Sequence, residues 1–360
     1  MSGLTAYISH DEYLKYQFGH SHPFKPIREK YALKILRELG VFEEKARLYE
    51  PDPATEDEIY LVHSKDYVRY VEGMCEKGGG YLDSGDTPAT KGLYEGARRV
   101  VGGSLLGAKL IMAGDVDHAF NPGGGLHHAK ADSASGFCVF NDIAITIRYL
   151  QRNYGVERIA VVDIDGHHGD GTQAIFYREP VLTISSHRIG IFPGTGYVDE
   201  VGSGEGNGYT INIPLERGTG DDAYLYAFNE VVPPLLESYD PDIIITQFGV
   251  DGHYQDPLVG LALTTRTYSV VAKTIHDLAH KLCRNRLLVL GGGGYDVSNT
   301  ARCWAIMFTE ICGGVSEGYV EQYRGLLDEP LPQSATILEH TKNIVEEIKR
   351  KIFPFHNIQA

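Results

Sequence analysis

The chain has 360 residues, of which 42% are hydrophobic, so it can bury a large core in one or two domains. Its formal charge of −15 at pH 7 argues against a protein that holds nucleic acid through a broad basic surface. The sequence shows no basic leader, no run of roughly 20 apolar residues and no Cys-x-x-Cys pair among its five cysteines, so we expect a cytoplasmic protein with free thiols and no membrane or nucleic-acid partner.

Short apolar runs alternate with longer segments of helical period, a pattern typical of a parallel sheet covered by helices on both faces. We expect strands at 5–9, 117–121, 158–163, 181–185, 209–213, 242–247 and 287–290. We expect helices at 27–39, 93–113, 141–153, 222–237, 265–282, 300–311 and 335–351, the last of them an amphipathic cap on the domain. Because no linker or internal repeat interrupts these elements, residues 1–360 are predicted to form a single domain.

Four of the predicted strands run into clusters of glycine and polar residues. The clusters are residues 122–128, 163–171, 248–253 and 291–295. In open α/β sheets ligands bind at the carboxyl ends of the strands, so we expect the four clusters to meet in one pocket.

The cluster at 163–171 reads Asp-Ile-Asp-Gly-His-His-Gly-Asp-Gly. Asp165 and His167 occupy alternate positions where an apolar strand ends, so both side chains can reach one divalent cation. Asp163 and Asp170 are then available to orient histidines, which usually give their second N–H to a carboxylate. The alternative, a solvated acidic loop, is disfavoured because burying so many ionisable groups without a cation is costly.

Three further clusters supply groups for hydrolytic chemistry. Asp251 follows an apolar strand, is flanked by glycines and is the candidate third ligand, or else a turn residue. Three protein ligands leave one position of a zinc ion open, as in catalytic zinc sites. His127 and His128 follow a glycine run and can act as a base and a charge-stabilising group, or else be structural. Tyr295 follows four glycines and can donate to a developing oxyanion, although most tyrosines are core residues.

These residues stand within a series of motifs that resembles the zinc-dependent histone deacetylase family of the arginase/deacetylase superfamily, including its prokaryotic deacetylase-like and acetoin-utilisation members. The likeness runs from about Tyr13 to Trp304. It rests on residues 22–28, 62–67, 86–90, 124–130, 135–142, 163–171, 192–196, 247–251 and 291–296. The resemblance implies an α/β fold with one open, mostly parallel eight-stranded sheet and helices on both faces.

By position, the resemblance implies three zinc ligands, Asp165, His167 and Asp251, although iron(II) suits the same donors. It implies five catalytic residues: His127, His128, Asp163, Asp170 and Tyr295. In the family's scheme, His128 with Asp170 is the general base and then the proton donor. His127 with Asp163 gives electrostatic support, and Tyr295 polarises the amide carbonyl.

The resemblance also implies substrate and cation sites. The substrate-binding residues are Arg28, Asp86, Gly136, Phe137, Phe192 and Leu258. Phe137 and Phe192 match the walls of an acyl-lysine tunnel, Asp86 its rim carboxylate, and Arg28 a polar foot pocket. A structural K⁺ or Na⁺ ion would use Asp163, Asp165, His167, Ser185 and Ser186.

The function implied is removal of acetyl or other short acyl groups from lysine side chains of proteins or peptides, by a metal-activated water. An acetylpolyamine or another small acylated amine is the alternative substrate, but Leu258 stands where polyamine-selective relatives have a glutamate. Gly85 and Gly166 depart from the family pattern and leave the acyl-chain preference open. The complete set of catalytic residues disfavours a catalytically silent acyl-lysine reader. A binuclear manganese site is disfavoured because the sequence offers ligands for only one metal. The sequence does not fix the oligomeric state.

Overall fold

The computed structural model of the protein describes residues 3–359, and its centre is an open eight-stranded sheet with the order β2-β1-β3-β8-β7-β4-β5-β6. All seven strand pairs in it are parallel. The strands are β1 Thr5–Ile8, β2 Ala46–Tyr49, β3 His118–Asn121, β4 Ile159–Asp163, β5 Leu182–Arg188, β6 Thr210–Leu215, β7 Ile243–Gln247 and β8 Leu287–Leu290. The predicted eight-stranded α/β fold is therefore confirmed, with a sheet that is wholly parallel.

The one strand that sequence patterns did not locate is β2, at the edge of the sheet beyond β1. It has four residues, of which only Ala46 is buried, while Arg47 and Leu48 are exposed. Such a segment has no continuous apolar run, so periodicity does not separate it from a loop. Its pairing with β1, in which Thr5 lies opposite Ala46, identifies it as a strand.

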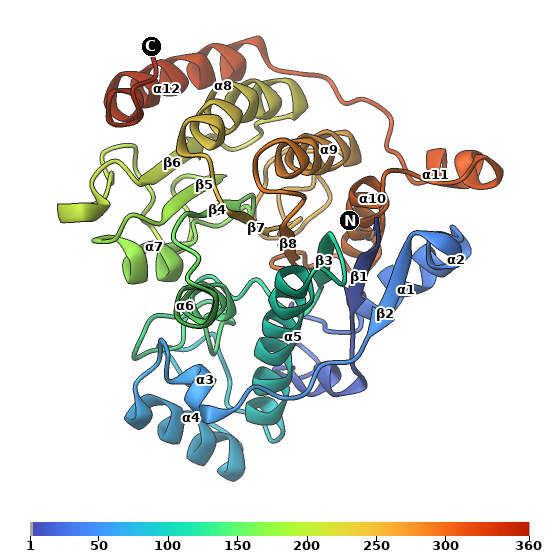
Figure 1. Ribbon diagram of the computed structural model, residues 1–360, viewed down its shortest axis with the longest axis vertical. Helices are drawn as coiled ribbons and strands as arrows, with labels where there is room; N and C mark the ends of the chain where they lie inside the picture. The colour runs from blue at the N-terminus through green and yellow to red at the C-terminus, as the bar shows by residue number, and fades with distance from the viewer. Residues whose placement is uncertain (1–2, 360) are drawn as a thin grey trace.

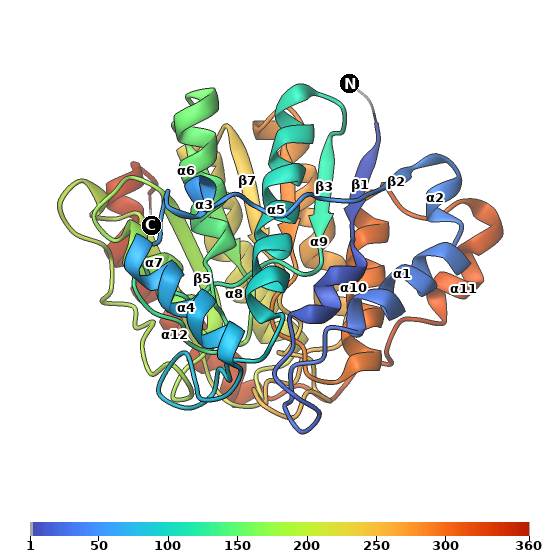
Figure 2. The ribbon, with the colours of Figure 1, turned by 90° about the horizontal axis from the view of Figure 1, so that it is seen from below.

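Helices cover both faces of the sheet, as Figures 1 and 2 show. One layer contains α1 Arg28–Glu38, α8 Asp221–Tyr239, α9 Thr265–Leu282, α10 Val297–Ile311 and α12 Ala335–Ile352. The other contains α5 Leu93–Ala113, α6 Asp142–Tyr154 and α7 Asp170–Phe176. Alternate strand residues enter the two layers, for instance Val162 the first and Val161 the second.

All seven predicted helices are present, with ends within three residues of those expected. The predicted cap on the domain is α12, which packs on α8 and β6 through Val345, Ile348 and Ile352. Sequence patterns missed several helices: α2 Val41–Glu44, α3 Glu56–Ile59, α4 Lys65–Lys77, α7 and α11 Val320–Arg324. The longest of these, α4, begins after Ser64, whose hydroxyl accepts from the Tyr67 N–H, a cap signal that lies inside one of the family motifs.

The strand order explains why segments far apart in sequence meet. Strands β3, β8, β7 and β4 are consecutive neighbours in the middle of the sheet. Because they are parallel, the four predicted clusters that follow them leave the same edge of the sheet. The pocket predicted from the sequence therefore has its physical basis in the strand order.

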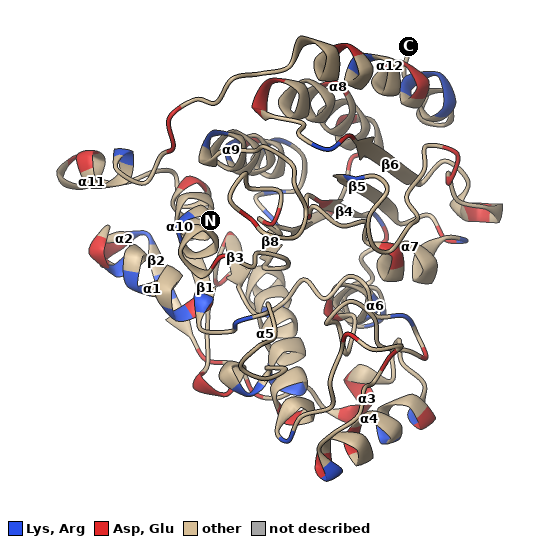
Figure 3. Ribbon diagram, turned by 180° about the vertical axis from the view of Figure 1, so that it is seen from behind, with Lys and Arg blue, Asp and Glu red and all other residues tan. Residues whose placement is uncertain are grey.

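Three other expectations concern composition. Within residues 3–359, no helix combines the length and apolar character that crossing a membrane requires. The five cysteines all lie in this range and are free thiols. Figure 3 shows acidic and basic residues interspersed along the outer helices. That residues 1–360 form a single domain stays a prediction.

The close contact between α5 and the segment before α3 gives a test of the packing. A Cβ on Gly102 would lie 1.9 Å from the Asp52 carbonyl oxygen and 3.0 Å from the Ala54 nitrogen. We expect Gly102→Ala to lower the free energy of unfolding by about 1–3 kcal/mol, because the backbone opposite must shift. Urea unfolding measures this.

The matched control is Gly73→Ala in α4, where a Cβ would have no atom within 4 Å. There the better helix propensity of alanine is expected to leave stability unchanged or to raise it by up to about 1 kcal/mol. An equal loss of stability in both variants would contradict the steric explanation.

Candidate active site

Three buried side chains at the carboxyl edge of the sheet form a candidate metal centre. Asp165, His167 and Asp251 each offer a ligand atom, and these atoms all lie within 4.8 Å of one another. His167 Nδ1 is 2.8 Å from Asp251 Oδ2 and 3.4 Å from Asp165 Oδ1. Two of the residues follow β4 and the third follows the neighbouring β7, so the predicted convergence is confirmed.

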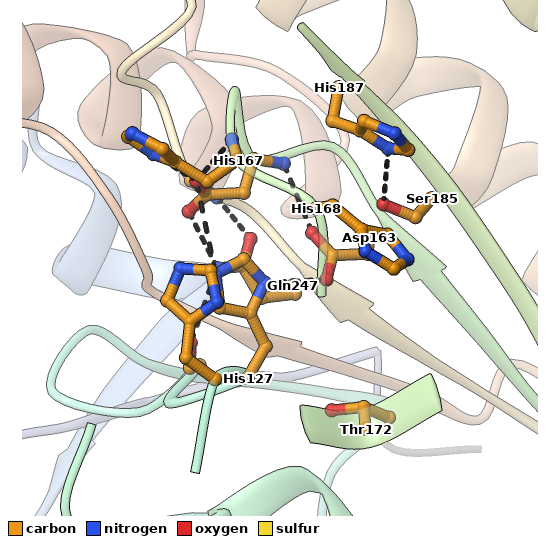
Figure 4. A network of polar contacts seen from close by, with 12 residues as sticks. His127, Asp163, His167, His168, Thr172, Ser185, His187 and Gln247 are labelled. Carbon is orange, nitrogen blue, oxygen red and sulfur yellow. Dashed lines mark hydrogen bonds and ion pairs between the residues drawn. The ribbon is translucent and has the colours of Figure 1, made fainter. Parts of the chain in front are cut away.

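Hydrogen bonds fix the two carboxylates of this centre. Asp165 Oδ2 accepts from Gln247 Nε2 and from the Gly293 N–H, both at 2.7 Å. Asp251 Oδ1 accepts from the Gly166 N–H at 2.6 Å. The second oxygen of each carboxylate faces His167 Nδ1, and Asp165 Oδ1 also accepts from the His167 N–H at 3.0 Å. Figure 4 shows Gln247 and His167 of this site from close by, with Asp163 and His127 beside them.

The electrostatics of the centre fit a divalent cation. Burial, together with the charge of Asp165, raises the pKa of Asp251 to about 7. Burial alone would lower the pKa of His167, but Asp251 and Asp165 raise it to about 10. In metal-free protein a proton thus balances two buried carboxylates, and a cation would replace it. Two carboxylates and one imidazole suit zinc with an open position, and iron(II) equally.

Two glycines let the loops approach this centre closely. A Cβ on Gly249 would lie 2.0 Å from Asp165 Oδ2, and a Cβ on Gly293 would lie 2.2 Å from Asp251 Oδ2. The two glycines that flank Asp251, Gly249 and Gly252, differ in what they make room for. Gly249 makes room for Asp165, while a Cβ on Gly252 would meet Leu263, outside the centre.

The predicted histidine pair lies beside the metal centre, and each member contacts its own carboxylate. His127 Nδ1 is 2.7 Å from Asp163 Oδ2, and His128 Nδ1 is 2.8 Å from Asp170 Oδ1. The two Nε2 atoms are 3.0 Å apart. Lys130 Nζ, 3.0 Å from the second oxygen of Asp170, keeps that carboxylate in place. Both predicted His–Asp pairs are thus formed.

The geometry of the pair fixes how many protons it carries. A carboxylate accepts, so each Nδ1 carries a hydrogen, and one further hydrogen lies between the two Nε2 atoms. Burial opposes charge on His127, but Asp163 and Asp165 raise its pKa. Burial and the neighbouring His127 lower the pKa of His128. The extra proton therefore belongs to His127, and His128 is the neutral member that can accept one.

Tyr295 is displayed by the four-glycine loop, and Arg28 holds that loop from behind. The buried Arg28 guanidinium donates to the carbonyl oxygens of Gly292 and Gly294, both at 2.7 Å, and stacks 4.7 Å from the Trp304 ring. Burial and the charge of Asp251 hold the pKa of Tyr295 far above its usual value, so the hydroxyl keeps its proton as a donor.

A pocket leads from the surface to these groups, lined by Asp86, His128, Gly136, Phe137, His167, Ile191, Phe192, Leu258 and Tyr295. It brings together every predicted substrate-binding residue except Arg28, which lies behind the glycine loop. The ring of Phe192 packs edge-on against His128 at 5.0 Å, and that of Phe137 against Tyr295 at 5.9 Å. The two aromatic side chains thus flank the entrance to the histidines and the tyrosine.

Phe137 stands in a backbone conformation that side chains rarely adopt, with φ of 66°. The Tyr16 hydroxyl donates to its carbonyl oxygen at 2.6 Å, and its N–H donates to Thr87 Oγ1 at 3.1 Å. These bonds hold the strained residue, a feature found where a side chain must be aimed precisely.

The residues predicted for a monovalent cation lie on β4, β5 and the loop after β4. Asp163 and Ser185 line a small cavity together with His168 and Asn212. Ser186 Oγ is 3.4 Å from the Asp163 carbonyl oxygen, and Ser185 Oγ is 2.9 Å from His187 Nδ1.

Three site residues were missed by the sequence analysis. Gln247 orients Asp165, as described above. Asp142, the first residue of α6, accepts from the N–H groups of Gly125 and Leu126 and so fixes the turn before His127. Asp256 accepts from the N–H groups of Tyr295 at 2.8 Å and Leu258 at 2.9 Å. The only sequence signal was position: Gln247 and Asp256 lie close to the cluster at 248–253, and Asp142 is the last residue of the family motif at 135–142.

Comparisons with known proteins agree with this geometry. Residues 22–311 match the model of the Histone deacetylase domain. The chain is 40% identical over 320 residues to the Acetoin utilization protein AcuC of Bacillus subtilis (strain 168), covering 86% of this chain and 82% of that protein. It is 37% identical over 353 residues to a Probable deacetylase of Archaeoglobus fulgidus, covering 96% and 97%.

The contact between Gln247 and Asp165 gives a test of the metal centre. Leucine has a similar size but cannot donate to Asp165 Oδ2, so we expect Gln247→Leu to weaken zinc binding by about 10–100-fold. Competition with a chromophoric chelator measures the dissociation constant.

The control is Gln151→Leu, which removes a 3.1 Å contact with Arg148 on α6, away from the site, and should leave zinc affinity unchanged. Wild-type affinity in Gln247→Leu would mean that the amide does not position the ligand.

Proposed function

We propose that this chain, which belongs to the histone deacetylase family and is a hydrolase of that family, removes acetyl or other short acyl groups from lysine side chains of proteins or peptides. The observation that carries the proposal is the aromatic-walled pocket that ends at Tyr295, His128 and His167. A flexible lysine chain with an amide at its tip has the shape to enter between Phe137 and Phe192 and present the carbonyl there.

The proposed cofactor is a zinc ion held by Asp165, His167 and Asp251, for which iron(II) is the alternative with the same donors. When bound, it supplies Lewis-acid chemistry, polarising a carbonyl and promoting the ionisation of water. We also propose a K⁺ or Na⁺ ion among Asp163, Asp165, His167, Ser185 and Ser186, two of which, Asp163 and Ser185, line a small cavity.

The proton steps are assigned to the histidine pair. His128, the neutral member, is assigned as the general base: its Nε2 gives up the 3.0 Å contact with His127 to accept the proton of the attacking water, while Asp170 holds its Nδ1. The charged His127, held by Asp163, stabilises the negative charge that develops on the substrate oxygen. When the amide carbon–nitrogen bond breaks, His128 returns the proton to the leaving amine, and acetate and free lysine result.

Tyr295 is assigned to the oxyanion. Its hydroxyl keeps its proton because burial and nearby carboxylates raise its pKa, so it can donate to the carbonyl oxygen as charge builds there. The Asp256 carboxylate, which accepts from the Tyr295 N–H, fixes the loop relative to the pocket rim. At that rim Asp86 is placed to accept N–H groups of a peptide backbone, which favours a peptide over a small amine.

Turnover of an acetyl-lysine peptide and an acetylpolyamine by zinc-loaded protein tests the proposal directly. We expect the peptide to be preferred, and Tyr295→Phe to lower its kcat by about 100- to 1,000-fold with unchanged zinc content, because one oxyanion donor is lost. Tyr31→Phe, at an exposed tyrosine outside the pocket, should behave as wild type. Preference for the polyamine would move the assignment to small-molecule metabolism, and turnover of neither would favour a longer acyl group or a silent reader.

Leu258 tests the substrate class at the rim, where its side chain is 40% exposed. We expect Leu258→Glu to raise kcat/KM for the acetylpolyamine relative to the peptide by up to about fivefold, because a partly exposed ion pair contributes ~1 kcal/mol or less. Leu258→Gln has a similar shape without the charge and should not shift the ratio. An equal shift in both variants would assign the effect to shape.

A further inference from the structure

Residues 3–359 contain one other group of three potential metal ligands, and it consists only of histidines: His118, His276 and His280. His118 is the first residue of β3, while His276 and His280 lie one turn apart on α9. His280 Nε2 is 3.1 Å from His118 Nε2 and 3.0 Å from His276 Nε2. Three imidazoles thus meet through their Nε2 atoms.

This histidine trio lies away from the deacetylase site. His118 is at the amino end of β3, whereas the active-site loop leaves the carboxyl end of that strand after Asn121. In the sheet His118 is level with Thr5 of β1 and Leu287 of β8, which are the first residues of their strands. The trio therefore lies at the amino ends of the strands, whereas the active site lies at their carboxyl ends, and its role is independent of the function proposed above.

Hydrogen bonding alone does not explain the trio. A ring nitrogen carries either one hydrogen or one lone pair. The central His280 Nε2 can therefore make one good hydrogen bond, yet it contacts two other ring nitrogens. A cation at the centre would use all three lone pairs at once.

The spacing and environment fit such a cation. Two nitrogens bound to one tetrahedral zinc ion lie roughly 3.3 Å apart, given Zn–N distances of about 2.0–2.1 Å. His118 is 3% exposed, the His276 side chain is 16% exposed and His280 is exposed, which leaves an open side for entry and for water ligands.

We propose that His118, His276 and His280 form a second metal site, which binds a divalent transition-metal ion of the zinc class and ties the amino end of β3 to α9. Imidazole nitrogen selects zinc, nickel or copper over magnesium and calcium, which require oxygen ligands. Asp277 Oδ1 lies 3.7 Å from His276 Nδ1, the ring nitrogen that faces away from His280.

Zinc stoichiometry of the full chain tests this proposal. Equilibrium dialysis against zinc followed by elemental analysis should give two zinc ions per wild-type chain, and one in His276→Ala/His280→Ala. The single variant His280→Ala, at an exposed position, should also lose the second ion. The control His340→Ala, at a half-exposed helix histidine outside the trio, should keep two. Deacetylase turnover is measured throughout and should be equal in all four proteins, which also reports that each is folded.

Thermal unfolding is the second measurement. Zinc in excess of one equivalent should raise the Tm of the wild type and of His340→Ala, but not that of the double variant. A single zinc ion per wild-type chain, a second ion that survives in the double variant, or its loss in His340→Ala would overturn the proposal.

Discussion

The burial of carboxylates at one edge of the sheet is the constraint on which the active site depends. Asp163 and Asp251 lie beyond reach of bulk water, so each needs its own donor. A histidine meets Asp163, a backbone N–H and a second histidine meet Asp251, and Gln247 serves the intervening Asp165. The loops are shaped by these requirements, because glycines stand where the oxygens need space.

Further buried contacts fix the loops that carry the active-site residues. Arg28 holds the carbonyls of the four-glycine loop from behind, and Asp142 holds the turn before the histidine pair. Asp256 joins the loop of Tyr295 to the pocket rim. None of these three side chains is assigned to the reaction, yet each fixes a backbone segment that carries a reacting group. The precision of the site therefore rests on buried polar bonds between loops.

The sequence predicted the parts of this arrangement that are encoded locally. Buried strands read as apolar runs, and the alternation of Asp163, Asp165 and His167 follows from strand geometry. Partners brought together only by the tertiary fold were not predictable in this way: no local pattern pairs Arg28 with the carbonyl oxygens of Gly292 and Gly294, more than 260 residues further along the chain. The edge strand β2 was missed because its register with β1, and not its composition, makes it a strand.

The strand order also has a consequence for how the chain is built. Strands β3 and β4 follow one another in sequence, but β8 and β7 lie between them in the sheet. During synthesis the two halves of the sheet are made first, and each exposes an unpaired edge. The metal ligands follow β4 and β7, which pair directly, so they meet only after residues up to Asp251 have emerged, and β8, which ends at Leu290, closes the gap last.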